Sequence, residues 1–366
     1  MGFTNTKTSP IRLAAEWILN SGIQSDAGGF YSWYDMEKKD YPYLYSEITG
    51  YGITTLLFLY RMVKDNRYLD NAKRAADWII NTALHICGGV MTRLYKDDKN
   101  GDPFYSFTGE NIFSFDTGMV LYGMVNLYKV TKDIKYLNVS KVLAGFLVDK
   151  IQKEDGSLSP AYNARDNRII ELSDKWSLQP GAFHAKVTMG LADISEVTGD
   201  EKYRDAAIAL CRYALNKQKP DGRFITDKVS GSTNLHPHCY AAEGLLYTGT
   251  CFKIEEFIDS AKKAATWIFD RVSEDGINEL YNPHTNAFTN FQRSDVLAQA
   301  LRLGVLFSLK DKIDMLKSKL LEYQYMGEDN NQHGGFLYAK NTSCVNSWCT
   351  MFAIQALVLH DNISLA

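Results

Sequence analysis

The chain has 366 residues, of which 45% are hydrophobic and 23% are charged, and its net charge is −3. These values are ordinary for a globular protein, and without a basic stripe they argue against nucleic acid as a partner. No apolar run approaches the ~18 residues that a membrane-spanning helix needs, so we expect no membrane span.

The N-terminal segment, the cysteines and the glycine turns predict the cellular location of the protein and whether it needs a cofactor. The segment from Met1 to Pro10 is polar and lacks the apolar stretch of a signal peptide, which predicts a cytoplasmic protein. The six cysteines have no Cys-x-x-Cys spacing, as expected for reduced thiols, and a zinc site using His238 and Cys239 is the alternative. No glycine turn follows a predicted strand, so we expect no organic cofactor. We also expect that no metal is required.

Hydrophobic periodicity predicts twelve helices of two alternating kinds. In chain order, the predicted pairs cover 10–21 and 46–65, 67–84 and 114–131, 133–152 and 181–197, 200–218 and 237–249, 254–272 and 292–308, and 310–326 and 345–360. The first helix of each pair is amphipathic, whereas the second is apolar nearly all round, as from Met351 to Leu357. A helix that is apolar all round is buried, so the second helices are predicted to form an inner ring and the first an outer ring.

Two short motifs repeat along this pattern. Glycine turns recur roughly every 60 residues, and we interpret them as helix C-caps; they lie at Gly28, Gly88, Gly156, Gly222, Gly276 and Gly334. Ala-Ala-x-Trp sequences end in Trp17, Trp78 and Trp267, which we expect to fill the core.

These repeats are longer and less equal than those of an open α-solenoid, which is the competing architecture, and they carry long loops before the inner helices. The sequence therefore predicts an all-α fold, a single (α/α)6 toroid domain over residues 1–366.

Every inner helix of such a ring starts at the same mouth, so the residues at the six starts converge. The predicted catalytic residues there are Glu47, Asp116, Asp295, His184 and His238. Glycoside hydrolysis needs two carboxyl groups, one protonated and one ionised. We predict Asp116 and Glu47 for that pair, with Asp295 as the third candidate.

The loops that lead to these starts are rich in aromatic residues. Aromatic faces stack on the C–H face of a sugar, while polar groups bind its hydroxyls. The predicted substrate-binding residues are Tyr51, Trp33, Trp176, His236, Tyr240, Glu243, Arg293, Asn346 and Trp348. His184, His238 and Arg293 are expected to position hydroxyls or a sugar carboxylate.

Each candidate also has a purely structural interpretation. Asp116 fits a helix N-cap, and Asp295 fits an ion pair with Arg293 or Arg302. A lone histidine is more often a satisfied polar residue than a catalyst. Trp33, Trp176 and Trp348 are equally compatible with packing.

Five segments together resemble known toroids, and they run from Tyr45 to Tyr51, Phe115 to Gly118, Phe183 to Lys186, Ser294 to Arg302 and Asn346 to Ala353. In this order they are similar to the six-hairpin glycosidases. They also resemble a group of prenyltransferase or squalene-cyclase repeat proteins that occurs with genes for surface-glycan assembly and archaeal protein N-glycosylation. The resemblance implies the toroid and a role in glycan metabolism.

Neighbouring families on this scaffold match the sequence less well. The Asp-x-Asp-Asp motif of squalene-type cyclases is absent, and Asp295, Cys239 and His238 match the prenyltransferase zinc site only loosely. The segment from Tyr240 to Glu243 stands where sugar 2-epimerases carry His-x-x-Glu.

Three functions stay open, and each takes a small sugar or an oligosaccharide as ligand. The leading hypothesis is a glycoside hydrolase acting on an oligosaccharide or a uronic-acid-containing glycan. The second is a sugar epimerase, isomerase or uronate lyase, in which His184 and either His238 or His236 act on the two faces of the ring. The third is a non-catalytic glycan-binding toroid.

Overall fold

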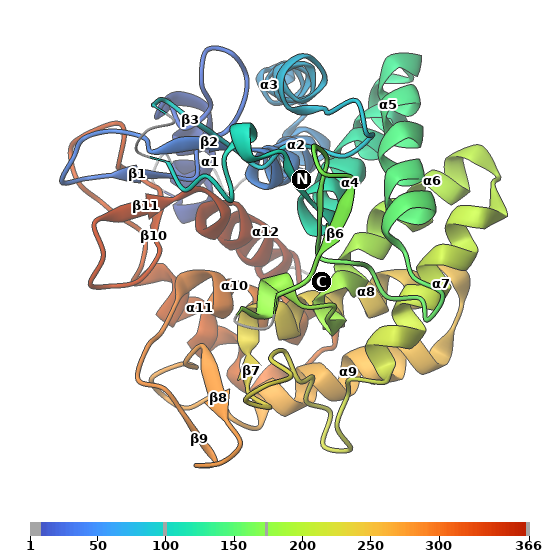
Figure 1. Ribbon diagram of the computed structural model, residues 1–366. Coiled ribbons are helices and arrows are strands. Elements are labelled where there is room, and N and C mark those ends of the chain that lie inside the picture. Colours follow the sequence, from blue (N-terminus) through green and yellow to red (C-terminus); the bar gives the residue numbers. More distant parts are fainter. Residues whose placement is uncertain (1–8, 98–100, 173–174, 364–366) are drawn as a thin grey trace.

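The computed structural model describes residues 9–97, 101–172 and 175–363, and these residues form six helical hairpins around a ring (Figure 1). The outer helices are α1 (Pro10–Asn20), α3 (Asn66–Trp78), α5 (Ile134–Gly145), α7 (Glu201–Leu215), α9 (Glu255–Phe269) and α11 (Ile313–Leu321). The inner helices are α2 (Ser46–Val63), α4 (Ser114–Thr131), α6 (Thr188–Thr198), α8 (Leu235–Phe252), α10 (Ser294–Leu306) and α12 (Ser347–Ile363).

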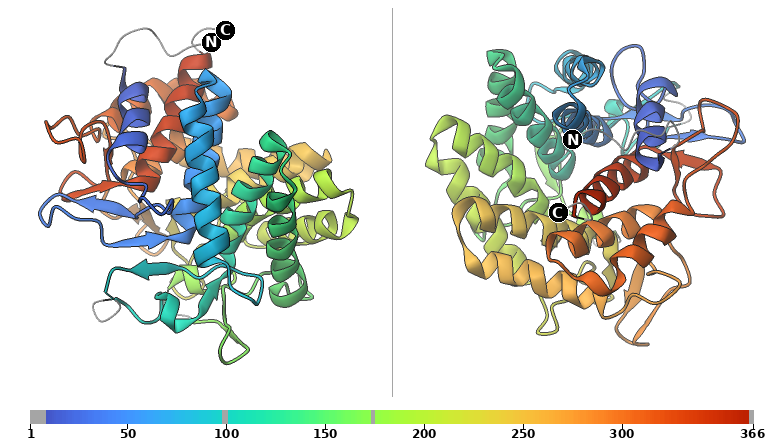
Figure 2. Two further views of the ribbon diagram at one scale, coloured as in Figure 1. Left: turned by 90° about the horizontal axis from the view of Figure 1, so that it is seen from above. Right: turned by 180° about the vertical axis from the view of Figure 1, so that it is seen from behind.

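The inner helices close into a complete ring. Helix α2 packs against α4, α4 against α6, α6 against α8, α8 against α10, α10 against α12, and α12 against α2 again. The outer helices α3, α5, α7, α9 and α11 each pack mainly on the inner helix that precedes them in the chain, and α1 packs on α12. The right-hand view of Figure 2 shows the resulting double ring. This confirms the predicted (α/α)6 toroid and excludes an open solenoid.

Local sequence explains where several outer helices begin. Asp65, Asp133 and Asp200 are N-caps whose carboxylates accept a hydrogen bond from the backbone two residues later. The third inner helix departs from the prediction, because its first six residues (Ala182–Val187) form a 3-10 helix. There α8 approaches closely, since a Cβ on Gly244 would lie 2.0 Å from Ala185 O.

Short strands that the all-α prediction did not include line the mouth. They are β1 (Trp33–Asp35), β2 (Tyr43–Tyr45), β3 (Arg93–Tyr95), β4 (Asn111–Phe113), β5 (Ala161–Asn163), β6 (Arg168–Ile170), β7 (Thr233–Asn234), β8 (Leu280–Asn282), β9 (Ala287–Phe288), β10 (Phe336–Leu337) and β11 (Cys344–Asn346). All pairings between them are antiparallel, in the orders β1-β11-β10, β2-β3, β4-β5-β6 and β7-β8-β9. Strand β1 pairs with β11 in the register Trp33↔Asn346, which joins the first hairpin to the last.

The glycine turns are not the helix caps that the sequence predicted. Helix α1 ends at Asn20, whereas Gly28 lies in a later tight turn in which Ser25 N donates to Gly29 O (2.9 Å). Gly28 has a φ of +107°, and a Cβ there would lie 2.2 Å from Arg74 O in α3, the next outer helix. Gly88, Gly156, Gly222 and Gly334 face α5, α7, α9 and α1 in the same way. These turns therefore lock neighbouring hairpins together, and Gly334 closes the ring.

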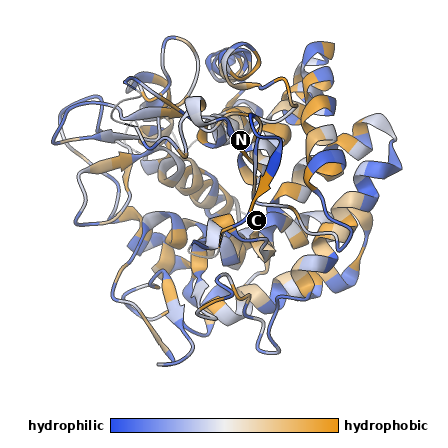
Figure 3. Ribbon diagram, viewed as in Figure 1, coloured by the Kyte–Doolittle hydropathy of each residue, from blue (hydrophilic) through white to orange (hydrophobic). Residues whose placement is uncertain are grey.

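The core lies between the two rings of helices. Trp17, Trp78 and Trp267 are buried in it, as predicted. Figure 3 shows hydrophilic residues on the peripheral loops and mixed faces on the outer helices. The six cysteines, all within the described residues, are free thiols. Among the described helices, none combines the length and apolarity needed to cross a membrane.

Candidate active site

A cavity of about 250 Å³ opens at the mouth where the inner helices begin. Aromatic rings form most of its wall, contributed by Tyr43, Tyr45, Tyr105, Phe113, Phe115, Trp176, Phe183, Tyr240 and Trp348. Its polar lining consists mainly of Glu47, Asp116, Arg93, His236 and Arg293. The cavity therefore brings together seven of the predicted site residues, namely Glu47, Asp116, Trp176, His236, Tyr240, Arg293 and Trp348.

Asp116 lies in the first turn of α4 and is buried. Its Oδ2 atom has no hydrogen-bond partner within the described part of the chain. Burial raises the pKa of Asp116 well above its ordinary value, and the nearby Glu47 carboxylate adds to this shift. A raised pKa favours the protonated carboxyl, which is the form that a general acid must have.

Glu47 occupies the equivalent first turn of α2 and is half-buried. Burial also raises its pKa, but hydrogen bonds with Tyr45 and Tyr51 and the charges of His236 and Arg93 oppose the shift. Asp116 is the more strongly shifted of the two, so Glu47 is the one that ionises first. Two neighbouring carboxyls titrate one after the other in this way because a single proton between them avoids two like charges.

Asp295 holds a buried network instead of lining the cavity. Arg293 donates to both of its oxygens, from Nε at 3.0 Å and from Nη2 at 2.5 Å. His236 Nδ1 lies 2.9 Å from Asp295 Oδ2, and Trp348 Nε1 donates to the same oxygen at 3.2 Å.

The charges around Asp295 decide its ionisation. Burial would raise the pKa of Asp295, but Arg293 and His236 outweigh it and hold that pKa well below its usual range. Asp295 is thus a permanent anion that fixes three side chains of the cavity wall. Its partner is Arg293, whereas Arg302 donates to Gln355 Oε1 at 2.7 Å.

Arg93 is a cavity residue that the sequence analysis missed. Its guanidinium lies over the rings of Tyr105, Tyr43 and Tyr45, at 4.2, 4.8 and 5.3 Å from the centroids. Its buried Nε has no hydrogen-bond partner among the described residues. Arg93 lines the cavity and therefore brings to it a positive charge that can attract a substrate oxygen. It lies on β3, a three-residue strand, where periodicity gives no signal.

His184 and His238 do not reach the cavity. His184 Nε2 lies 3.0 Å from Ser114 Oγ, and burial lowers its pKa to about 3. His238 Nδ1 accepts from Phe224 N (3.2 Å) and its Nε2 lies 3.1 Å from Ala264 O, while burial lowers its pKa to about 4. Both rings are thus neutral and hydrogen-bonded in the wall.

The occupied nitrogens of His238 also leave it without a free ligand atom for the zinc site that we considered with Cys239. Within the described residues no group of three or more His, Cys, Asp or Glu side chains is placed to hold a metal ion.

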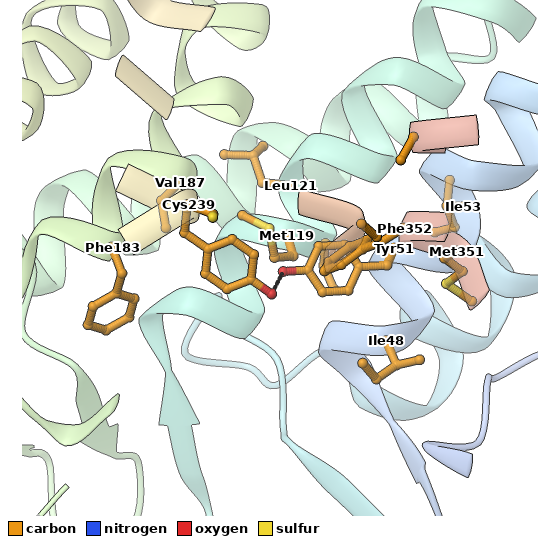
Figure 4. Close-up of a cluster of buried hydrophobic side chains, with 14 of the residues drawn as sticks. Ile48, Tyr51, Ile53, Met119, Leu121, Phe183, Val187, Cys239, Met351 and Phe352 are labelled. Atoms are coloured by element: carbon orange, nitrogen blue, oxygen red, sulfur yellow. Dashed lines mark hydrogen bonds between the residues drawn. The ribbon is translucent and has the colours of Figure 1, made fainter. Parts of the chain in front are cut away.

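Tyr51 lies deeper, where it lines a separate inner cavity of about 170 Å³. The Tyr51 hydroxyl donates to that of Tyr240 at 2.8 Å, and Figure 4 draws this bond as a dashed line beside Phe352 and Met119. Glu243 forms a buried ion pair with Lys186 and lies 3.5 Å from Arg302. These residues support the floor of the first cavity.

Trp33 and Asn346 belong to the strands that close the ring. Trp33 packs edge-on against Tyr43, with ring centroids 5.4 Å apart. Asn346 Oδ1 accepts from Cys349 N at 3.1 Å, so it caps the start of α12. Neither lines the cavity.

Comparisons with known proteins agree with a toroid that acts on carbohydrate. Residues 14–170 match the sequence profile of glycosyl hydrolase family 76. No curated protein sequence matches the chain.

Three solved structures illustrate the likeness of the fold. A D-mannose isomerase has a TM-score of 0.77 at 13% identity, over 98% of this chain and 99% of that one. A sugar epimerase from a ruminal bacterium has a TM-score of 0.74 at 14% identity, over 94% and 96%. An unsaturated glucuronyl hydrolase specific for heparin has a TM-score of 0.68 at 14% identity, over 98% and 97%. These structures share the toroid, and with the family match they support a carbohydrate-active enzyme.

Proposed function

We propose that this protein is a glycoside hydrolase in which Asp116 is the general acid and Glu47 is the ionised partner. The observation that carries the proposal is the pair itself, a buried carboxyl with a strongly raised pKa beside a half-buried one in an aromatic-walled cavity. The match of residues 14–170 to glycosyl hydrolase family 76 supports it.

The reaction needs a proton for the leaving oxygen and a negative charge near the anomeric carbon. Asp116 holds the proton, because ionising it would place a second charge beside Glu47 in a buried site. Glu47 either attacks the anomeric carbon or activates a water. Arg93 attracts a substrate oxygen by its charge, and Trp176 and Trp348 provide faces for the sugar ring.

The substrate is a saccharide whose reacting end fits a cavity of about 250 Å³, which lies near the lower end of small-molecule sites. We extend the proposal to glycan metabolism in a reducing, cytoplasmic compartment. The free thiols support that compartment, and the resemblance to proteins of N-glycosylation and surface-glycan clusters supports that role.

The test is incubation with a panel of nitrophenyl glycosides and uronic-acid disaccharides, followed by proton NMR in heavy water. We expect release of free sugar by the wild type and a loss of roughly 10²–10⁴-fold in Asp116→Asn. Full activity in both Asp116→Asn and Glu47→Gln would end this assignment.

A second candidate is a sugar epimerase or isomerase that uses His236. The observation in its favour is the hydrogen bond between His236 Nδ1 and Asp295 Oδ2, because a carboxylate that fixes a histidine is a common feature of proton transfer. An epimerase or isomerase would incorporate deuterium at a sugar carbon without cleaving a bond, and His236→Asn would abolish this incorporation.

A further inference from the structure

A second cavity at the mouth, about 500 Å³ in volume, lies outside the site described above. It is bounded by the end of α9, the strands β8 and β9, helix α11 and the loop after β10. Phe288, Phe291, Tyr323, Asn278, Asn290 and Asn341 contribute to its lining.

Two of the six junctions of the ring depart from the repeat, and this cavity lies at one of them. At four junctions a glutamine (Gln24, Gln152, Gln218 or Gln324) bridges its own glycine turn to a backbone carbonyl of the next outer helix. The fifth turn carries Ser273 instead, and a Cβ on Gly276 would meet Gln292 and Leu297 and not helix α11. The second turn carries Leu84 in place of the glutamine, yet a Cβ on Gly88 would still lie 3.3 Å from Val142 O in α5. At the fifth turn the glycine does not meet the next outer helix.

The lining offers the groups that a saccharide needs. Phe291 is 39% exposed, an unusual position for a large apolar ring. Asn278, Asn290 and Asn341 also line the cavity, and a side-chain amide can both donate and accept a hydrogen bond. Gln292 is held in place, since it donates to Asp275 O (2.8 Å) and accepts from the Tyr323 hydroxyl (2.9 Å).

A row of rings joins this cavity to the catalytic one. The centroids of Phe291 and Tyr338 are 6.4 Å apart, and those of Tyr338 and Trp348 are 6.0 Å apart. Trp348 lines the catalytic cavity, and Arg293, also of that cavity, lies over Tyr338 at 4.6 Å. The two cavities are therefore neighbours on either side of Tyr338.

We propose that this second cavity is a distal saccharide subsite, which binds the part of an oligosaccharide remote from the bond that is cleaved. The proposal rests on the proposed function only for the cleavage of a bond in the Asp116 cavity. Saccharide binding at the second cavity does not depend on that cleavage. It implies a substrate of several sugar units that runs from the Asp116 cavity past Tyr338 to Phe291.

The test is calorimetric binding to the full-length Asp116→Asn protein. The probes are cellopentaose, maltopentaose, mannopentaose and tetragalacturonate, each beside its own disaccharide. We expect at least one long saccharide to bind on the order of tenfold more tightly than its disaccharide. Adding Phe291→Ala should reduce that ratio roughly three- to tenfold, the value of one stacked ring.

The matched control is Ile86→Ala, which removes a side chain that is 98% exposed on another loop and should leave the ratio unchanged. The proposal is overturned if no probe gains affinity with length, or if Phe291→Ala leaves the ratio intact.

Turnover by the wild type separates the two proposals. Length-dependent binding that needs Phe291, without cleavage of any probe, would refute the hydrolase and keep the subsite. Cleavage without any gain in affinity with length would do the reverse.

Discussion

Asp116 carries the protonation state on which the proposed chemistry depends. Its pKa is raised by burial and by the Glu47 charge, so Glu47→Gln should lower it. The measurement is the titration of the Asp116 carboxyl by carbon NMR in both proteins. An unchanged titration would show that the two carboxyls do not interact.

The same shift has a consequence for stability. Because the folded pKa of Asp116 lies above the unfolded one, its contribution is fully present at low pH and is lost as the pH rises through the folded value. Asp116→Asn cannot ionise, so its melting temperature relative to wild type should increase with pH. We would measure it at several pH values between 4 and 9, and a constant difference would contradict the account.

The contribution of Asp295 to stability should change with pH in the opposite direction. Asp295→Asn leaves the buried Arg293 cation without its main partner, which should cost about 3 kcal/mol in urea unfolding. The depressed pKa means that the difference is full at neutral pH and shrinks in acid. Asp70→Asn, at a surface pair with Lys73 that is 67% exposed on the Asp70 side, is the control and should change little.

Sequence predicted those site residues whose position follows from a helix start. Glu47 and Asp116 both lie in the first turn of an inner helix, and the ring brings those turns together. His238 failed to reach the cavity although His236 did, because two residues along a helix turn a side chain to the other face. Arg93 was missed because nothing local predicts which mouth strand faces the cavity.

At the scale of elements, the glycine turns are the most testable feature. Gly334 has a φ of +90°, and a Cβ there would lie 2.5 Å from Leu13 O in α1. Gly199 has a φ of +71° with nothing within 4 Å of a Cβ, so it measures backbone strain alone.

We expect Gly199→Ala to cost about 1 kcal/mol, and Gly334→Ala clearly more because two hairpins must separate. Urea unfolding of both variants checks this. Equal losses would show that the turn does not lock α1 to the last hairpin.

The helices could be predicted because their periodicity extends over many residues, whereas the mouth strands could not. A strand of two or three residues is too short for a period, and β1 finds its partner β11 more than 300 residues away (Trp33↔Asn346). The glycine turns were found but misread, because their contact is with the next hairpin and not with the helix before them.

At the scale of the whole molecule, ring closure predicts cooperative unfolding. Helix α12 packs on α1 and α2, and Ser347 Oγ donates to Tyr31 O at 2.5 Å, so the first and last hairpins support each other. In hydrogen exchange at increasing urea, α1 and α12 should lose protection together with α6 and α7. Earlier loss at α1 and α12 would indicate the fraying of an open solenoid.

The role of Asp116 is best tested by proton NMR in heavy water on the glycoside panel, with wild type and Asp116→Asn side by side. We expect free sugar from the wild type, with an anomeric signal that reports inversion or retention, and almost none from the variant. Exchange of a sugar C–H without release, or equal release by both proteins, would contradict it.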